Sequence, residues 1–100
     1  MSSYFSSAVL LSALSLSIVG CSRDDPLIVR ILPNRYEVAG IASELATPVV
    51  DEVVRRKPRR VHVFVCESTP AKRHVQFITE LQARHKADIA GGLLEERECQ

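Results

Sequence analysis

The placement of charge divides this chain into two unlike parts. All 13 Lys and Arg residues and all 12 Asp and Glu residues lie at Arg23 or later, so residues 1–22 carry no charged side chain. The charged part is long enough for one domain but not for two, because domains usually span about 100–150 residues. The formal net charge of +1 also argues against a dedicated nucleic-acid-binding protein, which normally has a strong basic excess.

The uncharged leader contains a hydrophobic run with the length of a secretion signal. Residues 8–19 are 12 positions that are apolar apart from three serines. The hydrophobic region of a signal peptide has about 7–15 residues, whereas a helix that crosses a bilayer needs about 20. The leader departs from the usual signal in having no Lys or Arg before this run. An uncleaved short anchor and a buried apolar helix are the alternative interpretations.

The leader ends in Ile18-Val19-Gly20-Cys21, which resembles the lipobox of bacterial lipoproteins. The resemblance implies cleavage after Gly20, diacylglycerol on the Cys21 sulfur and acylation of the new N-terminus. A protein with two or more acyl chains is held stably at a membrane surface without spanning it. We therefore expect Cys21 to be a lipidation site.

These features predict the organisation of the whole chain. We expect a signal peptide over residues 1–20, a tether over residues 21–26, a periplasmic domain over residues 27–96 and a charged tail over residues 97–100. The lipid would anchor the protein to a membrane of the bacterial cell envelope. For lipoproteins of this type, Ser22 after the lipidated cysteine favours the outer membrane.

The pattern of apolar residues and turns in the body predicts a small α+β domain. Alternating or β-branched runs bounded by turn residues indicate strands. We expect strands over residues 27–32, 36–41, 61–66 and 87–94, and helices over residues 47–57 and 69–85. In the resulting ββαβαβ order, right-handed crossovers give parallel neighbours. The prediction is a mixed sheet with both helices packed on one face.

Each predicted helix begins with a Thr-Pro pair. In Thr47-Pro48 and Thr69-Pro70 the threonine suits the N-cap, and proline suits the first helical position because its missing N–H has no partner there. In the first helix, four valines repeat on one face and predict its buried side. In the second helix, the predicted buried stripe consists of Val75, Ile78 and Leu81.

Two cysteines remain if Cys21 carries lipid. An even pair in an exported protein can form a disulfide, and a bridge between Cys66 and Cys99 would contribute roughly 3–4 kcal/mol. Free, partly buried thiols are an equal alternative. Cys66 also stands at a strand end before a helix, a setting that lowers the pKa of a thiol. An exported thiol-dependent redox protein using Cys66 is therefore the alternative function, although no second cysteine follows two residues later.

Five cations occupy six positions around the end of the first helix. They are Arg55, Arg56, Lys57, Arg59 and Arg60. Such a run can contact an anionic surface, which includes phosphate, lipid headgroups and acidic polymers. The alternative is a solvated helix end and loop whose charge is balanced by acids elsewhere.

The order of features in the body resembles the periplasmic domain of the ExbD/TolR biopolymer-transport family. The matching features are Tyr36, Val38 and Gly40, the valine-rich helix, the strand from Pro58 to Val65, Thr69-Pro70, and the last strand with Ile89, Leu93 and Leu94. The resemblance implies a dimeric periplasmic domain beside a proton-driven motor. Members of the family carry an essential aspartate in a transmembrane helix, but this chain has no acidic residue before Asp24. We therefore expect no proton coupling.

The sequence as a whole predicts a non-catalytic protein of the cell envelope. We expect a lipid anchor in the membrane, an envelope protein as partner, and a homodimer as one form of assembly. No nucleophile–base pair, phosphate-binding loop or metal-ligand spacing is present, so we expect no enzyme activity, cofactor, metal or nucleic-acid partner.

Overall fold

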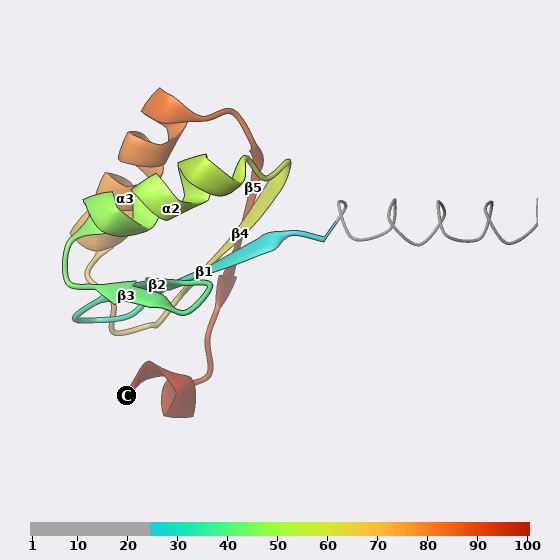
Figure 1. Cartoon of the computed structure of the whole chain (residues 1–100). Helices are drawn as coiled ribbons and strands as arrows, with labels where there is room; N and C mark the ends of the chain where they lie inside the picture. The colour runs from blue at the N-terminus through green and yellow to red at the C-terminus, as the bar shows by residue number, and fades with distance from the viewer. Residues whose placement is uncertain (1–24) are drawn as a thin grey trace, which may run out of the picture.

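The computed structural model describes residues 25–100 (Figure 1). The expected signal peptide, the lipobox and Cys21 lie outside the described residues. The described elements are β1 (Leu27–Ile31), β2 (Tyr36–Val38), β3 (Ile41–Ser43), α2 (Ala46–Arg56), β4 (Arg60–Val65), α3 (Ala71–Arg84), β5 (Asp88–Leu93) and the 3-10 helix η2 (Glu96–Cys99).

The strands form one mixed sheet in the order β3-β2-β1-β4-β5. The β3-β2-β1 part is antiparallel, and β4 runs parallel to both β1 and β5. Each parallel connection contains a helix, as crossover connections require. Both helices lie on the same side of the sheet (Figure 1). The predicted fold class, a small α+β domain with a mixed sheet and two helices, is confirmed.

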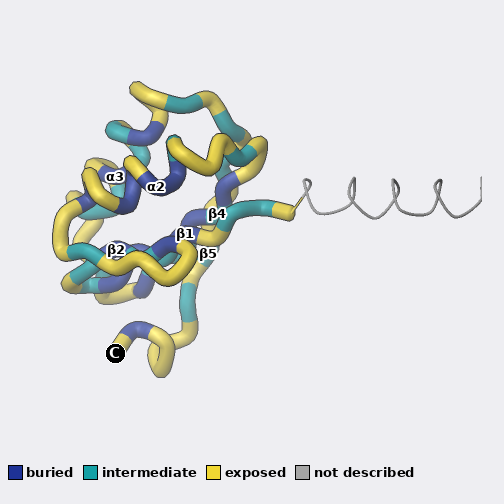
Figure 2. Tube along the Cα trace, viewed as in Figure 1, coloured by how far each residue is buried: buried dark blue, intermediate teal, exposed yellow. Residues whose placement is uncertain are grey.

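The main core lies between this sheet face and the helices. Val29 and Ile31 of β1 are buried, and their register partners on β4, Val63 and Val65, lie on the same face. Valines of α2 close the core from above, and in Figure 2 the dark blue, buried parts of the strands and helices face one another. The alternation along β1 thus places every second side chain in the core, as a period of two requires.

The strand predicted over residues 36–41 is two strands. Ala39 and Gly40 have positive φ angles of 48° and 84°, and they form the turn of a tight hairpin in which Val38 pairs with Ile41. Two-residue hairpin turns favour positive φ because it matches the twist of the flanking strands. The turn adds β3 to the edge of the sheet, which changes the predicted order to βββαβαβ.

The prediction that the two threonines cap the helices is wrong. The N-cap of α2 is Leu45 and that of α3 is Pro70, and neither has a side-chain cap bond. The Thr47 hydroxyl instead donates to Glu80 on α3 at 3.1 Å. The Thr69 hydroxyl donates to the carbonyl of Ile31 at 2.8 Å. Both hydroxyls thus connect separate elements, because Thr47 lies inside α2 and Thr69 lies one residue before the N-cap of α3.

Two residues of the predicted buried stripe of α3, Ile78 and Leu81, pack in the core, but Val75 does not. Phe77 and Leu81 are fully buried, but Val75 is 62% exposed. The Phe77 ring stacks on the Tyr36 ring of β2 at a centroid distance of 6.0 Å. Because β5 is the edge of the sheet, Val75 has no strand beyond it to cover it.

Candidate functional site

An apolar groove runs between α3 and the edge strand β5. It has a volume of about 420 Å³, and Val75 and Ile78 line it on the helix side while Ile89 and Gly91 line it on the strand side. His74, Thr79 and Gln82 supply the polar groups of its lining. The exposed Val75 therefore belongs to a continuous apolar surface. We call this groove together with the outer edge of β5 the α3–β5 surface.

Among residues 25–100 no strand pairs with the outer edge of β5, which gives this surface unpaired backbone groups. β5 pairs with β4 on one side only, because it is the last strand of the sheet. Leu93, near its end, is 70% exposed. The adjacent Gly92 leaves room for the ring of Phe64, since a Cβ there would lie 2.7 Å from the Phe64 Cε1. An edge strand of six residues with an exposed leucine can accept another strand.

The sheet face opposite the helices is mixed in polarity and is partly covered by η2, whose Glu98 contacts Arg30. Arg30 and Glu37 form an ion pair at 3.6 Å on it, and the rings of His62 and Phe64 meet edge to face at a centroid distance of 6.2 Å. Ile28 is 42% exposed beside them. Most of these groups already have a partner within the face, so it is a weaker binding surface than the α3–β5 surface.

Cys66 and Cys99 are joined in a disulfide with a Cα–Cα distance of 6.0 Å. Leu32 is fully buried beside the two cysteines, and Leu94 packs against them. The segment expected as a charged tail is therefore attached to the domain through η2. In this state Cys66 presents no thiol, and its residue is only 2% exposed.

The structure divides the five predicted surface cations into two groups. Arg55 donates to Glu52 through two nitrogens, and Arg56 donates to it at 2.6 Å. Hydrogen bonds from Arg55 and Arg56 lower the pKa of Glu52 to about 2, and the bond to Glu52 raises the pKa of Arg55. These two arginines thus balance the negative charge of Glu52, which is a buried residue.

The other three cations, Lys57, Arg59 and Arg60, lie beyond the last turn of α2 and are exposed. They form no ion pair among residues 25–100. Lys57 has a φ of 49° and ends α2, because its N–H bonds back to the carbonyls of Val53 and Val54. This turn directs the following residues away from the helix.

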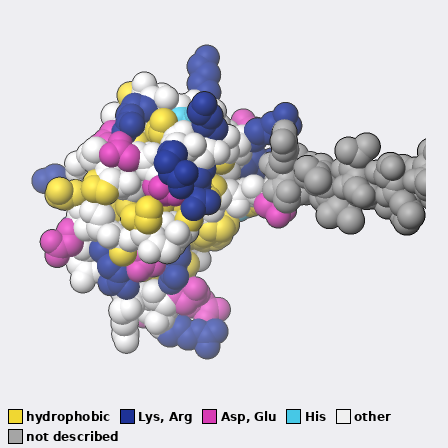
Figure 3. All heavy atoms as spheres, viewed as in Figure 1, with side chains coloured by type: hydrophobic (Ala, Val, Ile, Leu, Met, Phe, Trp, Pro, Cys, Tyr) yellow, Lys and Arg dark blue, Asp and Glu magenta, His cyan; other side chains and the backbone are white. Residues whose placement is uncertain are grey.

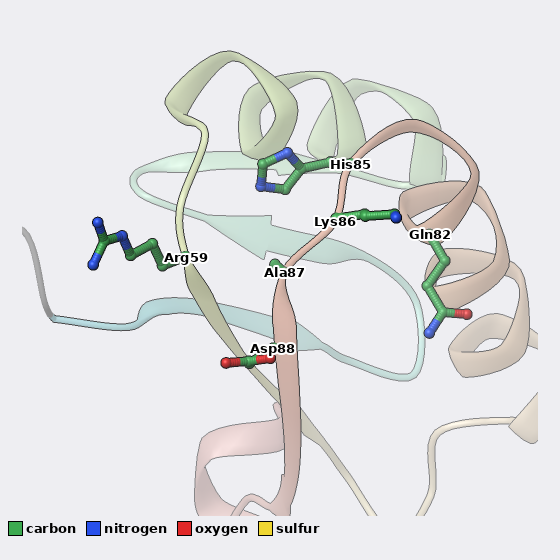
Figure 4. A pocket seen from close by; sticks show the side chains of 6 residues that line it. All are labelled: Arg59, Gln82, His85, Lys86, Ala87 and Asp88. Atoms are coloured by element: carbon green, nitrogen blue, oxygen red, sulfur yellow. The ribbon is translucent and has the colours of Figure 1, made fainter.

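Arg59 borders a shallow hollow between the end of α3 and the start of β5, with a volume of about 640 Å³. In Figure 4 the side chains of Arg59 and Lys86 point in opposite directions, and that of Asp88 does not meet either of them. The His85 ring is held by a 2.7 Å contact between its Nε2 and the Pro58 carbonyl. Because the polar groups diverge, the hollow does not assemble a catalytic constellation.

Other features of the described part set limits on the site. Among residues 25–100, no helix has the length and apolar character to cross a membrane. The same residues contain no group of three or more His, Cys, Asp or Glu side chains placed to hold a metal ion.

The fold and these surfaces define a two-layer α+β domain with an open sheet edge. Comparisons of the chain with protein-family models, curated proteins and solved structures found no match. The sequence pattern did not reveal the α3–β5 surface, because the helical spacing of Val75 predicts a core residue. The glycine pair before Leu93 in the last strand could have indicated this surface, because a strand with two glycines buries little apolar side-chain area.

Proposed function

We propose that this protein is a lipid-anchored protein of the bacterial cell envelope whose α+β domain binds a protein partner through the α3–β5 surface. The observation that carries the partner proposal is an apolar groove beside an unpaired strand edge. Peptides recognised by strand addition gain affinity from main-chain hydrogen bonds at an edge and specificity from neighbouring side-chain pockets. The β5 edge offers the first, and the groove at Val75 and Ile78 offers the second.

The anchor proposal is supported by residues 18–21 and their resemblance to a lipobox. The described chain enters β1 at one end of the domain (Figure 1), so an anchor before residue 25 would not disturb the strands and helices of the fold. The resemblance of the body to the ExbD/TolR periplasmic domain supports a place in the periplasm, with the outer membrane favoured by Ser22. We propose no proton coupling, no catalysis and no cofactor.

A photocrosslinking experiment tests the partner surface. Leu93 and Leu45 are both 70% exposed. Leu93 is the last residue of β5, and Leu45 directly precedes α2. A photoreactive residue is placed at either position in the full chain in cells. We expect a specific adduct from position 93 and none of the same mass from position 45. A second copy of the chain in the adduct would identify a homodimer. Equal adducts from both positions, or none from position 93, would contradict the proposal.

Substitution of the same two leucines gives the matched test of affinity. Leu93→Lys places a charge in the surface and is expected to weaken partner binding at least about tenfold, because a charge buried in an interface costs more than about 1.4 kcal/mol. Leu45→Lys makes the same chemical change elsewhere and should leave binding unaltered. Both variants should keep the wild-type unfolding midpoint.

Metabolic labelling with palmitate tests the anchor separately. We expect label on the wild-type chain, none on Cys21→Ser, and accumulation of precursor when the lipoprotein signal peptidase is inhibited. Label that persists in Cys21→Ser would refute lipidation at this cysteine, and the result bears on no other part of the proposal.

A further inference from the structure

The near-zero net charge of this protein conceals a separation of charge along the strands. The parallel strands β1, β4 and β5 all begin at one end of the domain, since Leu27 pairs with Val61 and Val61 with Ile89. Both helices end there as well, because α2 leads into β4 and α3 into β5. We call this the tether end, because the chain enters the domain there from residue 25 (Figure 1).

The tether end carries an excess of cations. Its seven Lys and Arg residues are Arg55, Arg56, Lys57, Arg59, Arg60, Arg84 and Lys86, and its four acids are Asp25, Asp51, Glu52 and Asp88. The excess is therefore +3. In Figure 3, dark blue side chains gather on the upper right of the visible face, next to the point where the described chain begins.

The opposite end has the opposite sign. Its five cations are Arg30, Arg35, Lys72, Arg73 and Arg97, and its seven acids are Glu37, Glu44, Glu67, Glu80, Glu95, Glu96 and Glu98. This end therefore carries −2. The Thr47–Glu80 hydrogen bond places Glu80 at the end where α2 begins.

Helix ends alone do not account for the cations of the tether end. Basic residues in a last turn are favourable because of the helix dipole, and Arg55, Arg56 and Arg84 lie in such turns. These three also have intramolecular acids, Glu52 for the first two and Asp51 for Arg84 at 2.6 Å. Lys57, Arg59 and Lys86 lie in the loops beyond the helices, and Arg60 is the first residue of β4. None of these four cations makes an ion pair within residues 25–100.

We propose that the tether end docks on the anionic phospholipid headgroups of the membrane that holds the anchor. This inference rests on the proposed lipid anchor. Residues 21–26 would span at most about 20 Å when extended, so these four cations would stay close to the bilayer. Clusters of Lys and Arg next to a membrane are attracted to anionic lipids, and the attraction falls off within a Debye length of about 8 Å.

Docking in this way fixes the direction in which the domain faces. The acidic end, with the disulfide and Leu93 at the close of β5, would point away from the membrane. The repulsion between its acids and the lipid would oppose the inverted arrangement. The lipid-bound domain would thus present the outer part of the α3–β5 surface to the periplasm.

Hydrogen exchange on vesicles tests this proposal. The full chain, processed in cells, is reconstituted in phosphatidylcholine vesicles with or without phosphatidylglycerol. We expect slower amide exchange at residues 57–60 and 85–88 on the anionic vesicles only, and loss of this protection at high salt. Equal exchange on both kinds of vesicle would overturn the proposal.

Two double variants with the same change in net charge provide the control. Arg59→Glu with Lys86→Glu removes two loop cations at the tether end. Because each cation near an anionic surface contributes about fivefold, this variant should shift the docking equilibrium by at least about 25-fold and abolish the protection. Lys72→Glu with Arg97→Glu, at the opposite end, should retain it. Loss of protection in both variants would indicate only a net-charge effect and would refute docking through the tether end.

Mass spectrometry of the same samples separates this proposal from the anchor. A lipid mass on the N-terminal peptide shows that the anchor is present, and the exchange data then decide docking. If the peptide carries no lipid, the anchor proposal fails. Docking is then decided by adding the unacylated chain to the same two kinds of vesicle, where protection confined to anionic vesicles supports it and its absence overturns it.

Discussion

The two helices of this domain cover the sheet to very different degrees. In α2 five of 11 residues are buried, and four of them are apolar: Ala46, Val49, Val50 and Val53. In α3 only Phe77 and Leu81 are buried among 14 residues. In Figure 2 the tube of α3 accordingly shows less dark blue along its length. α2 encloses the antiparallel side of the core, whereas α3 covers the parallel side only in part.

The difference separates a well-buried side of this small fold from a side with exposed apolar residues, to which we assign the proposed partner binding. The α2 side buries its apolar residues and closes its helix end with the bonds between Glu52 and the two arginines. The α3 side leaves Val75 and Leu93 exposed and keeps a strand edge free. An exposed apolar area beside an open edge has a cost in solubility, so its presence favours a binding role.

The largest expected effect concerns the single aromatic anchor of α3. Phe77→Ala removes a fully buried ring and should lower the free energy of unfolding by about 3–5 kcal/mol. Urea titration followed by circular dichroism measures the change. Phe77→Leu, which refills most of the volume, should restore more than half of it. A loss below about 1 kcal/mol for the alanine variant would show that α3 is held elsewhere.

The second effect concerns the covalent attachment of the C-terminus. Cys99→Ser removes the disulfide between Cys66 and Cys99, which are 33 residues apart in the sequence. This change should lower the free energy of unfolding by about 2–4 kcal/mol. The melting temperature of this variant should match that of the wild type in a reducing agent, which is the control. Higher activity toward a thiol substrate after reduction, lost in Cys66→Ser, would instead favour the redox hypothesis.

The third effect is a dependence on pH at the end of α2. The pKa of Glu52 is lowered from 4.5 to about 2 in the fold. Since the folded pKa is depressed, its stabilising contribution is present above about pH 4.5 and is lost as the pH falls toward 2. Glu52→Gln should therefore be less stable than the wild type at neutral pH, with a difference that shrinks through this window. Asp51→Gln, at an exposed neighbouring carboxylate, should show a smaller change.

The smallest effect is expected on the open side of α3. Val75→Ser should change the free energy of unfolding by less than about 0.5 kcal/mol, because the residue is 62% exposed and surface substitutions are usually near neutral. The same urea titration measures it. A loss comparable to that of Phe77→Ala would mean that α3 is covered on this side too, and the contrast between the two helices would disappear.

The sequence predicted the α+β class and the register-defining alternation of β4 because a strong period of two needs no tertiary information. It also predicted that Cys66 and Cys99 were available for a bridge, but it left bridge and free thiols open. The third strand was missed because a glycine at position 40 suits a bulge or a strand end within one longer strand, and the positive φ of Ala39 cannot be read from its residue type. Local pattern alone did not distinguish a bulge from a hairpin turn.

The sequence by itself determined the separation of leader from body, the strands of the parallel core and the position of every charge. Only the tertiary structure decided which charges meet. It paired Arg55 and Arg56 with Glu52 and left Arg59 and Lys86 in loops at the tether end. It also decided that Val75 faces a groove, because the exposure of a helical residue depends on whether a strand lies beneath it. Burial and charge pairing follow from distances between segments remote in the chain, and these distances are properties of the fold.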